Sequence, residues 1–440
     1  MSDLASRLAK LPADRRAEIL ALLRDSDEPR VSAAPVRRIR GETGPVSFAQ
    51  ETLWFLQRLA PRHPTYNVPI CFRLTGTLDV TAFRRAFADV VARHEMLRTS
   101  IAEGPDGPVQ TVHPSVPVDV PLVDAPGADT ESRRSAGAAL VDELSRQPFA
   151  MEQAPVWRVA LIRVAEDEHL FLFVIHHVIF DGWSLSVLCA DLADRYGAWR
   201  GADAPAPAPA NRLDYPDYAL WQRDWLAGEN LSSLIDYWRT TLAGAAVLEF
   251  PTDRPRPPVQ SYDGALLRRR VKLADPAGIA RLARALHTTP NTIYTATFFA
   301  LLHRFTGQDD LVIGTPNANR EYAEVESVIG YFINMLVLRA DASGDPTFRE
   351  FVARVNTLSR EALTHGGLPF GKLVEAVRPV RDPSRSPLFQ IAFVFQNTDG
   401  SFVLPEVVAE RIHIDPAISR FDMSVNLYEH ADGIEYNIEY

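Results

Sequence analysis

Residues 170–184 read LFLFVIHHVIFDGWS and carry the clearest signal of the fold class. Residues 170–175 are all apolar, which is typical of a strand that is buried on both faces. The strand ends in two adjacent histidines, His176 and His177, and a short turn with aspartate and glycine follows. A helix then fits residues 184–199. The stretch therefore predicts a buried strand, a turn and a helix in direct succession, as in an α/β protein.

The flanking segments extend this α/β pattern along the chain. In the first half, residues 157–164 are a second apolar strand candidate, residues 70–75 alternate as in a half-buried strand, and Asp79 is predicted to cap a helix. In the second half, the pattern predicts a helix over 277–287 and a second helix that Asn291 caps and that runs to about residue 305. It also predicts strands over 311–315, 332–338 and 388–395. The sequence therefore predicts two lobes, each a sheet with helices.

An irregular segment separates the two predicted lobes. Residues 201–212 read GADAPAPAPANR, and the alternation of alanine and proline favours an extended connector. We therefore expect a first lobe over residues 45–210 and a second lobe over residues 211–440. The preceding residues 1–44 are expected to form an amphipathic helix and a polar linker. That helix either docks a partner or packs on its own domain.

Composition excludes several classes of protein. The 440 residues are 46% hydrophobic and 23% charged, as in folded globular proteins, and the net charge of -10 argues against a nucleic-acid binder. The two cysteines, Cys71 and Cys189, are too few for a disulfide framework or a cysteine zinc site. The chain has no apolar run of the ~18 residues that a membrane span needs, and no secretory leader. We therefore expect a cytoplasmic protein without a membrane or nucleic-acid partner.

The two adjacent histidines are the sharpest chemical feature of the sequence. Neighbouring strand residues point to opposite faces, so one histidine can face a cleft while the other packs inward. A histidine at a strand end, with one ring nitrogen held by a backbone group, is suited to act as a general base near neutral pH. A metal site would need both histidines on one side and a third ligand, which the alternation opposes. Two structural core histidines are the remaining alternative.

Seven short motifs run in one order along the chain. The first motif is SFAQ at 47–50 with LWFL at 53–56 and YNVP at 66–69, the second is RHEMLRT at 93–99, and the third is HHVIFDG at 176–182. The fourth is YPDYALW at 215–221, and the fifth is IGYFIN at 329–334 with Arg339. The sixth combines His365, PF at 369–370, PLFQ at 387–390 and QN at 396–397, and the seventh is RFD at 420–422. In content and order they resemble the motifs of condensation domains of nonribosomal peptide synthetases. HHxxxDG is the active-site signature of these domains and is shared with the chloramphenicol-acetyltransferase-like acyltransferase superfamily.

The resemblance implies both a fold and a reaction. The fold is α/β, with two chloramphenicol-acetyltransferase-like lobes that form a V-shaped pseudo-dimer with a central tunnel. The reaction joins a donor aminoacyl or peptidyl thioester to an acceptor aminoacyl thioester, each on the phosphopantetheine arm of a carrier protein. The domain itself then binds no cofactor or metal. Its partners are an upstream donor carrier, a downstream acceptor carrier and an adjacent adenylation domain, and we expect a monomer. The first motif resembles those of domains that take an L-configured donor and an L-configured acceptor.

The resemblance also assigns roles to residues of the signature. His177 matches the catalytic histidine, which either accepts a proton or positions the amine and stabilises the tetrahedral intermediate, and His176 is expected to be structural. Asp181 matches an aspartate that forms a structural salt bridge, and Arg98 is its expected partner. Gly182 is expected to let substrate or backbone approach closely.

Three further residues complete the expected site. Trp183 and Ser184 finish the turn and start the next helix. Asn334 matches an asparagine that lines the substrate tunnel, and its alternative role is a strand-end side chain bonded by the backbone. The chain departs from the family pattern at Ile101 and Gly371, and its second lobe is expected to be truncated because the sequence stops at Tyr440.

Two other functions stay open. One is a stand-alone acyltransferase of the same fold that uses coenzyme A thioesters. The other is a non-catalytic module that only docks carrier proteins, which an intact His177 disfavours.

Overall fold

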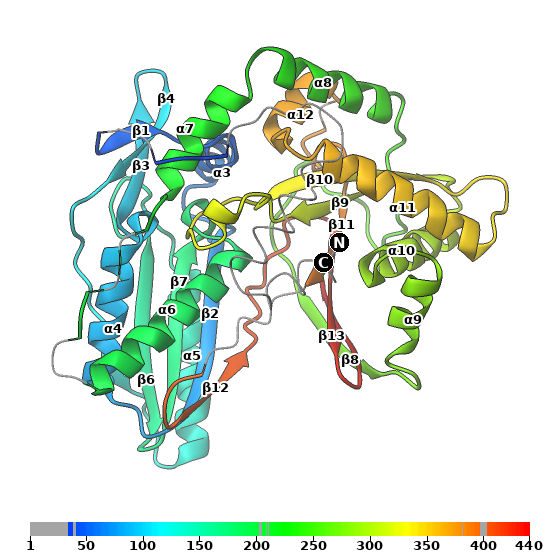
Figure 1. Cartoon of the computed structure of the whole chain (residues 1–440). Coiled ribbons are helices and arrows are strands. Elements are labelled where there is room, and N and C mark those ends of the chain that lie inside the picture. The colour runs from blue at the N-terminus through cyan, green and yellow to red at the C-terminus, as the bar shows by residue number, and fades with distance from the viewer. Residues whose placement is uncertain are drawn as a thin grey trace.

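Two sheets, each with its own helices, form two lobes that lie side by side (Figure 1). The computed structural model describes residues 34–37, 41–201, 205–207, 209, 211–380, 382–396 and 403–440. In Figure 1, α7 (Tyr215–Trp225) and α8 (Gly228–Leu242) run across the top of both lobes, and the lower ends of the lobes stand apart. The helix expected within residues 1–44 lies outside the described residues.

The first lobe is built on a five-stranded sheet in the order β12-β2-β7-β6-β5. Its strands are β2 (Asn67–Gly76), β5 (Leu122–Asp124), β6 (Trp157–Ala165), β7 (Glu168–His176) and β12 (Val407–Ile412). Helices α4 (Val80–Arg93) and α6 (Gly182–Gly201) contribute to the core on one face, and α5 (Thr130–Arg146) to the core on the other. All nine residues of β7 are buried, which confirms the predicted strand with two buried faces.

A small sheet and a helix stand at the top of this lobe. The sheet has the order β1-β4-β3, with strands β1 (Thr43–Pro45), β3 (Thr99–Gly104) and β4 (Gly107–Val112). Helix α3 (Phe48–Leu59) follows β1, and Ser47 and Gln50 close its first turn with reciprocal hydrogen bonds. A 3-10 turn, η1 (Glu95–Arg98), leads into β3.

The second lobe is built on a six-stranded sheet in the order β10-β9-β11-β13-β14-β8. Its strands are β8 (Leu266–Lys272), β9 (Asp310–Asn317), β10 (Asn334–Asp341), β11 (Ile391–Gln396), β13 (Met423–His430) and β14 (Gly433–Glu439). Its helices are α9 (Gly278–Ala285), α10 (Pro290–Thr306), α11 (Phe348–Thr364) and α12 (Phe370–Val377). A 3-10 turn, η3 (Ala323–Val325), lies between β9 and β10 in the chain. This lobe has its own hydrophobic core, in which α10 and α11 pack on the sheet.

Helix caps show where local signals suffice. Asp79 caps α4 through its carboxylate, which accepts from the Ala82 amide at 2.9 Å, as predicted. The prediction that Asn291 caps the helix that ends near residue 305 is wrong, because Thr289 is the N-cap of that helix, α10. The hydroxyl of Thr289 accepts from the Thr292 amide, and Pro290 occupies the first helical position, where its missing N–H costs nothing.

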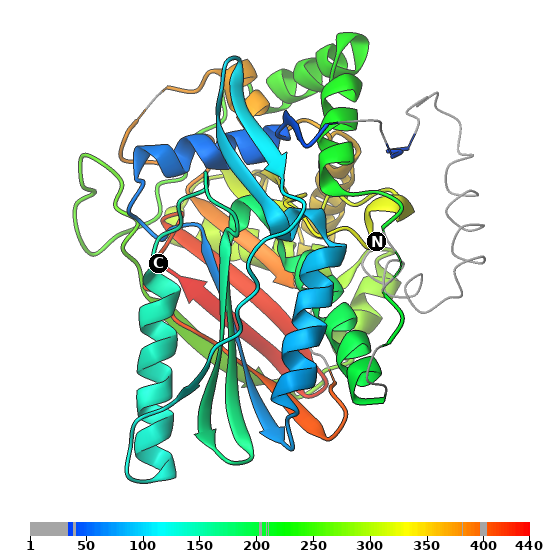
Figure 2. The same ribbon diagram turned by 90° about the vertical axis from the view of Figure 1, so that its left-hand side faces the viewer.

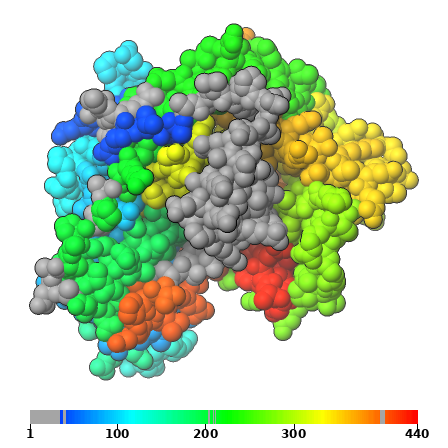
Figure 3. Space-filling view, viewed as in Figure 1, coloured from blue at the N-terminus to red at the C-terminus, as the bar shows by residue number. Residues whose placement is uncertain are grey.

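The two lobes do not divide the chain at one point. Strand β12, expected in the second lobe, pairs antiparallel with β2 at the edge of the first sheet (Figure 2). In Figure 3 its orange surface lies against the first lobe. An exposed sheet edge has unpaired backbone groups, and β12 supplies partners for that edge. Val325, Val328 and Ile329 likewise belong to the core of the first lobe. The predicted border near residue 210 therefore misplaces these segments.

Candidate active site

The end of β7 holds His177 by two backbone contacts. A 3-10 turn, η2 (His177–Ile179), begins directly after the strand. The amide of His177 donates to the carbonyl of Tyr66 at 2.8 Å. Ring nitrogen Nδ1 lies 2.6 Å from the carbonyl oxygen of Phe180, and because a carbonyl only accepts, Nδ1 carries the proton. Nε2 of the neutral ring is therefore left with its lone pair.

His176 points the other way and is fully engaged. Its Nδ1 accepts from the Val178 amide at 3.1 Å, and its Nε2 lies 3.3 Å from the side-chain oxygen of Gln57. The side chain is buried, and the rings of Tyr66 and Phe149 flank it. With both ring nitrogens bonded, His176 has no lone pair for a metal or a substrate. Across the described residues, no group of three or more histidine, cysteine, aspartate or glutamate side chains is placed to hold a metal ion.

Both histidines are held in the neutral form. Burial lowers the pKa of His177 to about 4, and the positive charge of Arg420 acts in the same direction. The Phe180 carbonyl and Asp181 oppose this shift. Burial, His177 and Arg420 lower the pKa of His176 to about 3. Part of the His177 surface stays accessible, and the ring meets that of Tyr331 edge-on, with centroids 4.9 Å apart. At neutral pH the site therefore presents an uncharged imidazole as a hydrogen-bond acceptor.

The prediction that Arg98 pairs with Asp181 is wrong, because Arg320 does so. The guanidinium of Arg320 lies 3.1 Å and 3.2 Å from the two carboxylate oxygens of Asp181. Both side chains are 1% exposed. Arg98 instead donates to the backbone carbonyls of Ala92 and His113 within the first lobe. These carbonyls satisfy its guanidinium locally, while the Asp181 carboxylate faces the segment that precedes β10.

The turn after β7 is anchored to that same segment. Asp181 accepts from the amide and hydroxyl of Ser184 at 2.8 and 2.7 Å, and from the Phe332 amide at 3.1 Å. The Ser184 hydroxyl also contacts both backbone groups of Gly330. The indole of Trp183 donates to the Glu326 carbonyl at 2.8 Å. The motif therefore fixes the 326–332 segment against the first lobe.

Gly182 has open space in front of it. A Cβ atom added there would meet no heavy atom within 4 Å, and the backbone does not need the left-handed conformation. No other part of the backbone therefore approaches closely at this position, which was one of the two reasons expected for a glycine. The open space would admit a substrate, and that role of Gly182 stays a prediction.

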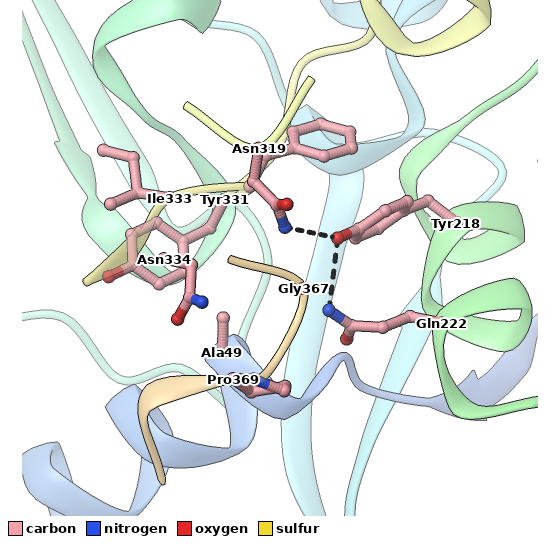
Figure 4. A pocket seen from close by; sticks show the side chains of 10 residues that line it. Ala49, Tyr218, Gln222, Asn319, Tyr331, Ile333, Asn334, Gly367 and Pro369 are labelled. Carbon is pink, nitrogen blue, oxygen red and sulfur yellow. Dashed lines mark hydrogen bonds between the residues drawn. The ribbon is translucent and has the colours of Figure 1, made fainter. Parts of the chain in front are cut away.

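A small pocket is lined on one side by Tyr331, whose ring also meets that of His177 (Figure 4). Its walls come from both halves of the chain: Ala49, Tyr218, Gln222, Asn319, Tyr331, Phe332, Ile333, Asn334, Gly367 and Pro369. The Tyr218 hydroxyl is bonded to the side chains of Gln222 and Asn319 at 3.1 and 3.0 Å, as Figure 4 shows.

Asn334 lines this pocket, but its amide is fully used by the backbone. Its Nδ2 donates to the carbonyls of Gly366 and Leu368 at 2.8 and 2.7 Å, and its Oδ1 accepts from the Phe370 amide at 2.9 Å. Asn334 therefore holds the 366–370 segment, which forms one wall of the pocket. The sequence leaves both roles open.

Four residues near His177 escape sequence reasoning as site residues: Tyr66, Arg320, Tyr331 and Arg420. Tyr66, Tyr331 and Arg420 lie within motifs, yet no spacing rule places them beside a histidine over 100 residues away. Arg320 lies outside the motifs, and no sequence signal distinguishes it from other arginines.

The family model described as "Condensation domain" matches residues 41–440. This chain belongs to the condensation-domain family. It is 39% identical over 404 residues to part of a linear gramicidin synthase of Brevibacillus parabrevis, covering 90% of this chain and 8% of that protein. It is 34% identical to phosphinothricin tripeptide synthetase PhsC of Streptomyces viridochromogenes, covering 100% of this chain and 41% of that protein. The chain thus spans less than half of either relative.

Solved structures agree with this assignment. The X-domain from teicoplanin biosynthesis is 30% identical, with a TM-score of 0.82 over 93% of this chain and 92% of that one. The first condensation domain of the CDA synthetase is 20% identical, with a TM-score of 0.74 over 91% and 93% of the two chains, which shows the fold. The predicted two-lobe α/β fold is confirmed. No helix among the described residues is long and apolar enough to cross a bilayer.

Proposed function

We propose that this condensation domain joins a donor aminoacyl or peptidyl thioester to the amine of an acceptor aminoacyl thioester. Both substrates arrive on phosphopantetheine arms of carrier proteins, one upstream and one downstream, in a synthetase that also has an adenylation domain. The observation that carries the proposal is the free Nε2 of His177, held at the junction of the lobes beside a pocket with walls from both halves of the chain. The two arms meet in a tunnel between the lobes.

The proposed reaction forms one C–N bond and breaks one C–S bond. The acceptor amine attacks the thioester carbonyl, and the tetrahedral intermediate expels the thiolate, which takes up the proton that the amine loses. A neutral imidazole with a low pKa is a weak base in the free domain. His177 therefore serves first as an acceptor that orients the amine. It receives the proton only as the amine nitrogen becomes positively charged in the intermediate, and it then passes that proton to the departing thiolate. Holding both reactants in one site supplies much of the acceleration.

A covalent acyl-enzyme is not part of the proposal. Both cysteines are buried, and burial raises the pKa of the Cys71 thiol to about 12, so its thiolate is scarce at neutral pH. No G-x-S-x-G nucleophile elbow occurs in the sequence. Direct attack by the amine is the simpler route.

One comparison favours a second candidate function. The X-domain of teicoplanin biosynthesis, 30% identical to this chain, has also been solved in a complex with OxyB. A module that only docks a protein partner is therefore the alternative. It requires no free imidazole at the lobe junction, whereas condensation does.

The test is a reconstituted condensation followed by intact-protein mass spectrometry. One carrier is loaded with L- or D-configured donors and a second carrier with acceptors, and the wild type is compared with His177→Ala. His430→Ala, at the end of β13, removes a histidine far along the chain from the motif and serves as the control. We expect a mass gain on the acceptor carrier with L-configured donors, retained by the control and lost by His177→Ala while the fold persists.

Three outcomes would contradict the proposal. Wild-type turnover by His177→Ala would remove the histidine from the mechanism. No transfer between any pair of carriers, by a folded protein, would favour the docking module, and transfer from coenzyme A thioesters alone would favour a stand-alone acyltransferase.

A further inference from the structure

Three consecutive residues, Arg420, Phe421 and Asp422, send their side chains to three different places. Phe421 packs against Phe389, a buried residue of the second lobe, with ring centroids 5.0 Å apart. Asp422 is paired with Arg256. Arg420 instead reaches the first lobe, where its Nε donates to the carbonyl of Thr65 at 3.2 Å. Two of the three side chains therefore anchor the segment, and the third crosses between the lobes.

The backbone of Arg420 is itself held in place. Its carbonyl accepts from the side chain of Gln260 at 3.1 Å, and the preceding amide, of Ser419, donates to the Tyr262 carbonyl at 3.0 Å. The Ser419 hydroxyl bonds to the Phe421 carbonyl at 2.6 Å. Arg420 is thus presented from a fixed support and not from a free loop.

Arg420 contacts the segment that holds His177. The Thr65 carbonyl, which accepts from Arg420, immediately precedes Tyr66, whose carbonyl accepts from the His177 amide at 2.8 Å. The guanidinium also lies 5.7 Å from the centroid of the Tyr66 ring, within the range of a cation–π contact. The Tyr66 ring in turn stands 6.2 Å from that of His176. One backbone step therefore separates the arginine contact from the histidine contact.

We propose that Arg420 is a positioning residue for His177, which fixes the Thr65–Tyr66 backbone from the second lobe and so sets the place and charge state of the imidazole. This inference deepens the function proposed above and rests on it for its catalytic consequence. Its structural part, the coupling between Arg420 and His177, stands without that function.

Electrostatics gives the arrangement a second effect. Burial is the main cause of the low pKa of His177, and the Arg420 charge lowers it further, whereas Asp181 acts in the opposite direction. His176 at the end of β7 and Tyr331 before β10 also lie beside the ring. Arg420 also faces Glu439 on β14, whose pKa is raised by burial and lowered by Arg420. Replacing the arginine by a neutral residue therefore allows His177 to take up a proton at a higher pH.

The experiment is a histidine titration by NMR on the free domain. Isotope-labelled imidazoles are followed from pH 8 to pH 4, and the His177 signal is assigned by its loss in His177→Ala. The variants are Arg420→Gln, which removes the charge, and Arg420→Lys, which keeps it. Arg62→Gln, at an exposed arginine in the turn after α3, is the control for one lost charge. We expect the His177 pKa to rise in Arg420→Gln by more than in Arg62→Gln, and to change little in Arg420→Lys.

Turnover with carrier-bound substrates gives the second readout. Because displacement of a catalytic group by about 1 Å can cost ~100-fold in rate, we expect Arg420→Gln to lower kcat by ~10- to 100-fold with little change in KM, and its pH profile to shift upward. Arg420→Lys should recover part of the rate.

The outcomes separate the two proposals. An unchanged His177 titration in Arg420→Gln, or an equal shift in Arg62→Gln, overturns the positioning role. If Arg420→Gln does not fold, a His177 pKa in Arg420→Lys as high as that of an exposed histidine overturns it instead. A shifted titration in a domain that condenses no substrate supports the coupling and rejects only the proposed reaction.

Discussion

In the folded chain the carboxylate of Asp181 and the guanidinium of Arg320 are each 1% exposed. Replacing Asp181 by alanine removes the acceptor for five hydrogen bonds, from Arg320 twice, from Ser184 twice and from the Phe332 amide. The Arg320 charge is then left buried without its counter-ion. Breaking such a pair from one side costs about 3–5 kcal/mol of unfolding free energy. The neighbouring change His177→Ala removes one hydrogen bond to the Phe180 carbonyl and should cost about 1 kcal/mol.

Urea denaturation followed by tryptophan fluorescence measures the difference. Trp183, which bonds across the same junction, is one of the seven tryptophans whose summed emission reports unfolding. The double variant, Asp181→Ala with Arg320→Met, removes both charges and replaces the guanidinium with an apolar side chain. Because no charge is then stranded, the double variant should unfold at a higher urea concentration than Asp181→Ala alone.

Either of two results would refute this reasoning. One is an equal urea midpoint for Asp181→Ala and His177→Ala, which would mean that the carboxylate contributes no more stability than the imidazole. The other is a double variant that is less stable than Asp181→Ala, which would mean that Arg320 stabilises the lobe through its other contacts. Those contacts include the carbonyls of Val325 and Val328, the Ser184 hydroxyl, and the rings of Phe332 and Trp183.

Three further predictions concern pH, the pocket wall and metals. His176 is neutral in the folded state down to pH ~3, whereas in the unfolded chain it takes up a proton near pH ~6.5. Its contribution to the free energy of unfolding is therefore full above pH ~6.5 and falls by about 1.4 kcal/mol per pH unit as the pH drops toward 4. Urea midpoints measured at pH 7, 6 and 5 should fall less steeply in His176→Gln than in the wild type, and equal slopes would contradict this. Asn334→Ala leaves three backbone groups of the 366–370 segment without a hydrogen-bond partner. Each group that stays buried should lower the free energy of unfolding by about 1–3 kcal/mol. A melting temperature unchanged from the wild type would argue against the backbone role of Asn334. Condensation should persist in excess chelator because both ring nitrogens of His176 are engaged, and activity lost with the chelator and restored by zinc would overturn that expectation.

Local sequence patterns account for the buried strand, the two histidines and the turn that follows them. The apolar run at 170–175 is buried on both faces because a strand alternates its side chains, and that alternation also separates His176 from His177. The expectation that a backbone group holds one ring nitrogen of a strand-end histidine is met by the Phe180 carbonyl. Asp181 pairs with an arginine, as the resemblance implies, and it also holds the turn by accepting from the Ser184 amide. Apart from the arginine, each of these contacts lies within a few residues of the motif.

Other features needed contacts between distant segments. Arg98 is close to the predicted site in the order of motifs, yet the partner of Asp181 is Arg320, 139 residues further along the chain. Strand β12 closes the edge of a sheet whose other strands all precede residue 177. An asparagine at position 334 suits either expected role, lining the tunnel or bonding to the backbone. Only the position of the carbonyls in the 366–370 segment shows that its amide bonds to the backbone.

The strand, the turn, the orientation of the two histidines and the family can be predicted before folding is considered, because they depend on side-chain periodicity and on short motifs. The cation that faces Asp181, the groups that Asn334 binds, and the contact of Arg420 with the segment holding His177 can be found only in the folded chain. A buried polar group must find a partner wherever the packing of the two lobes places one. That place is set by the whole fold and not by spacing along the chain.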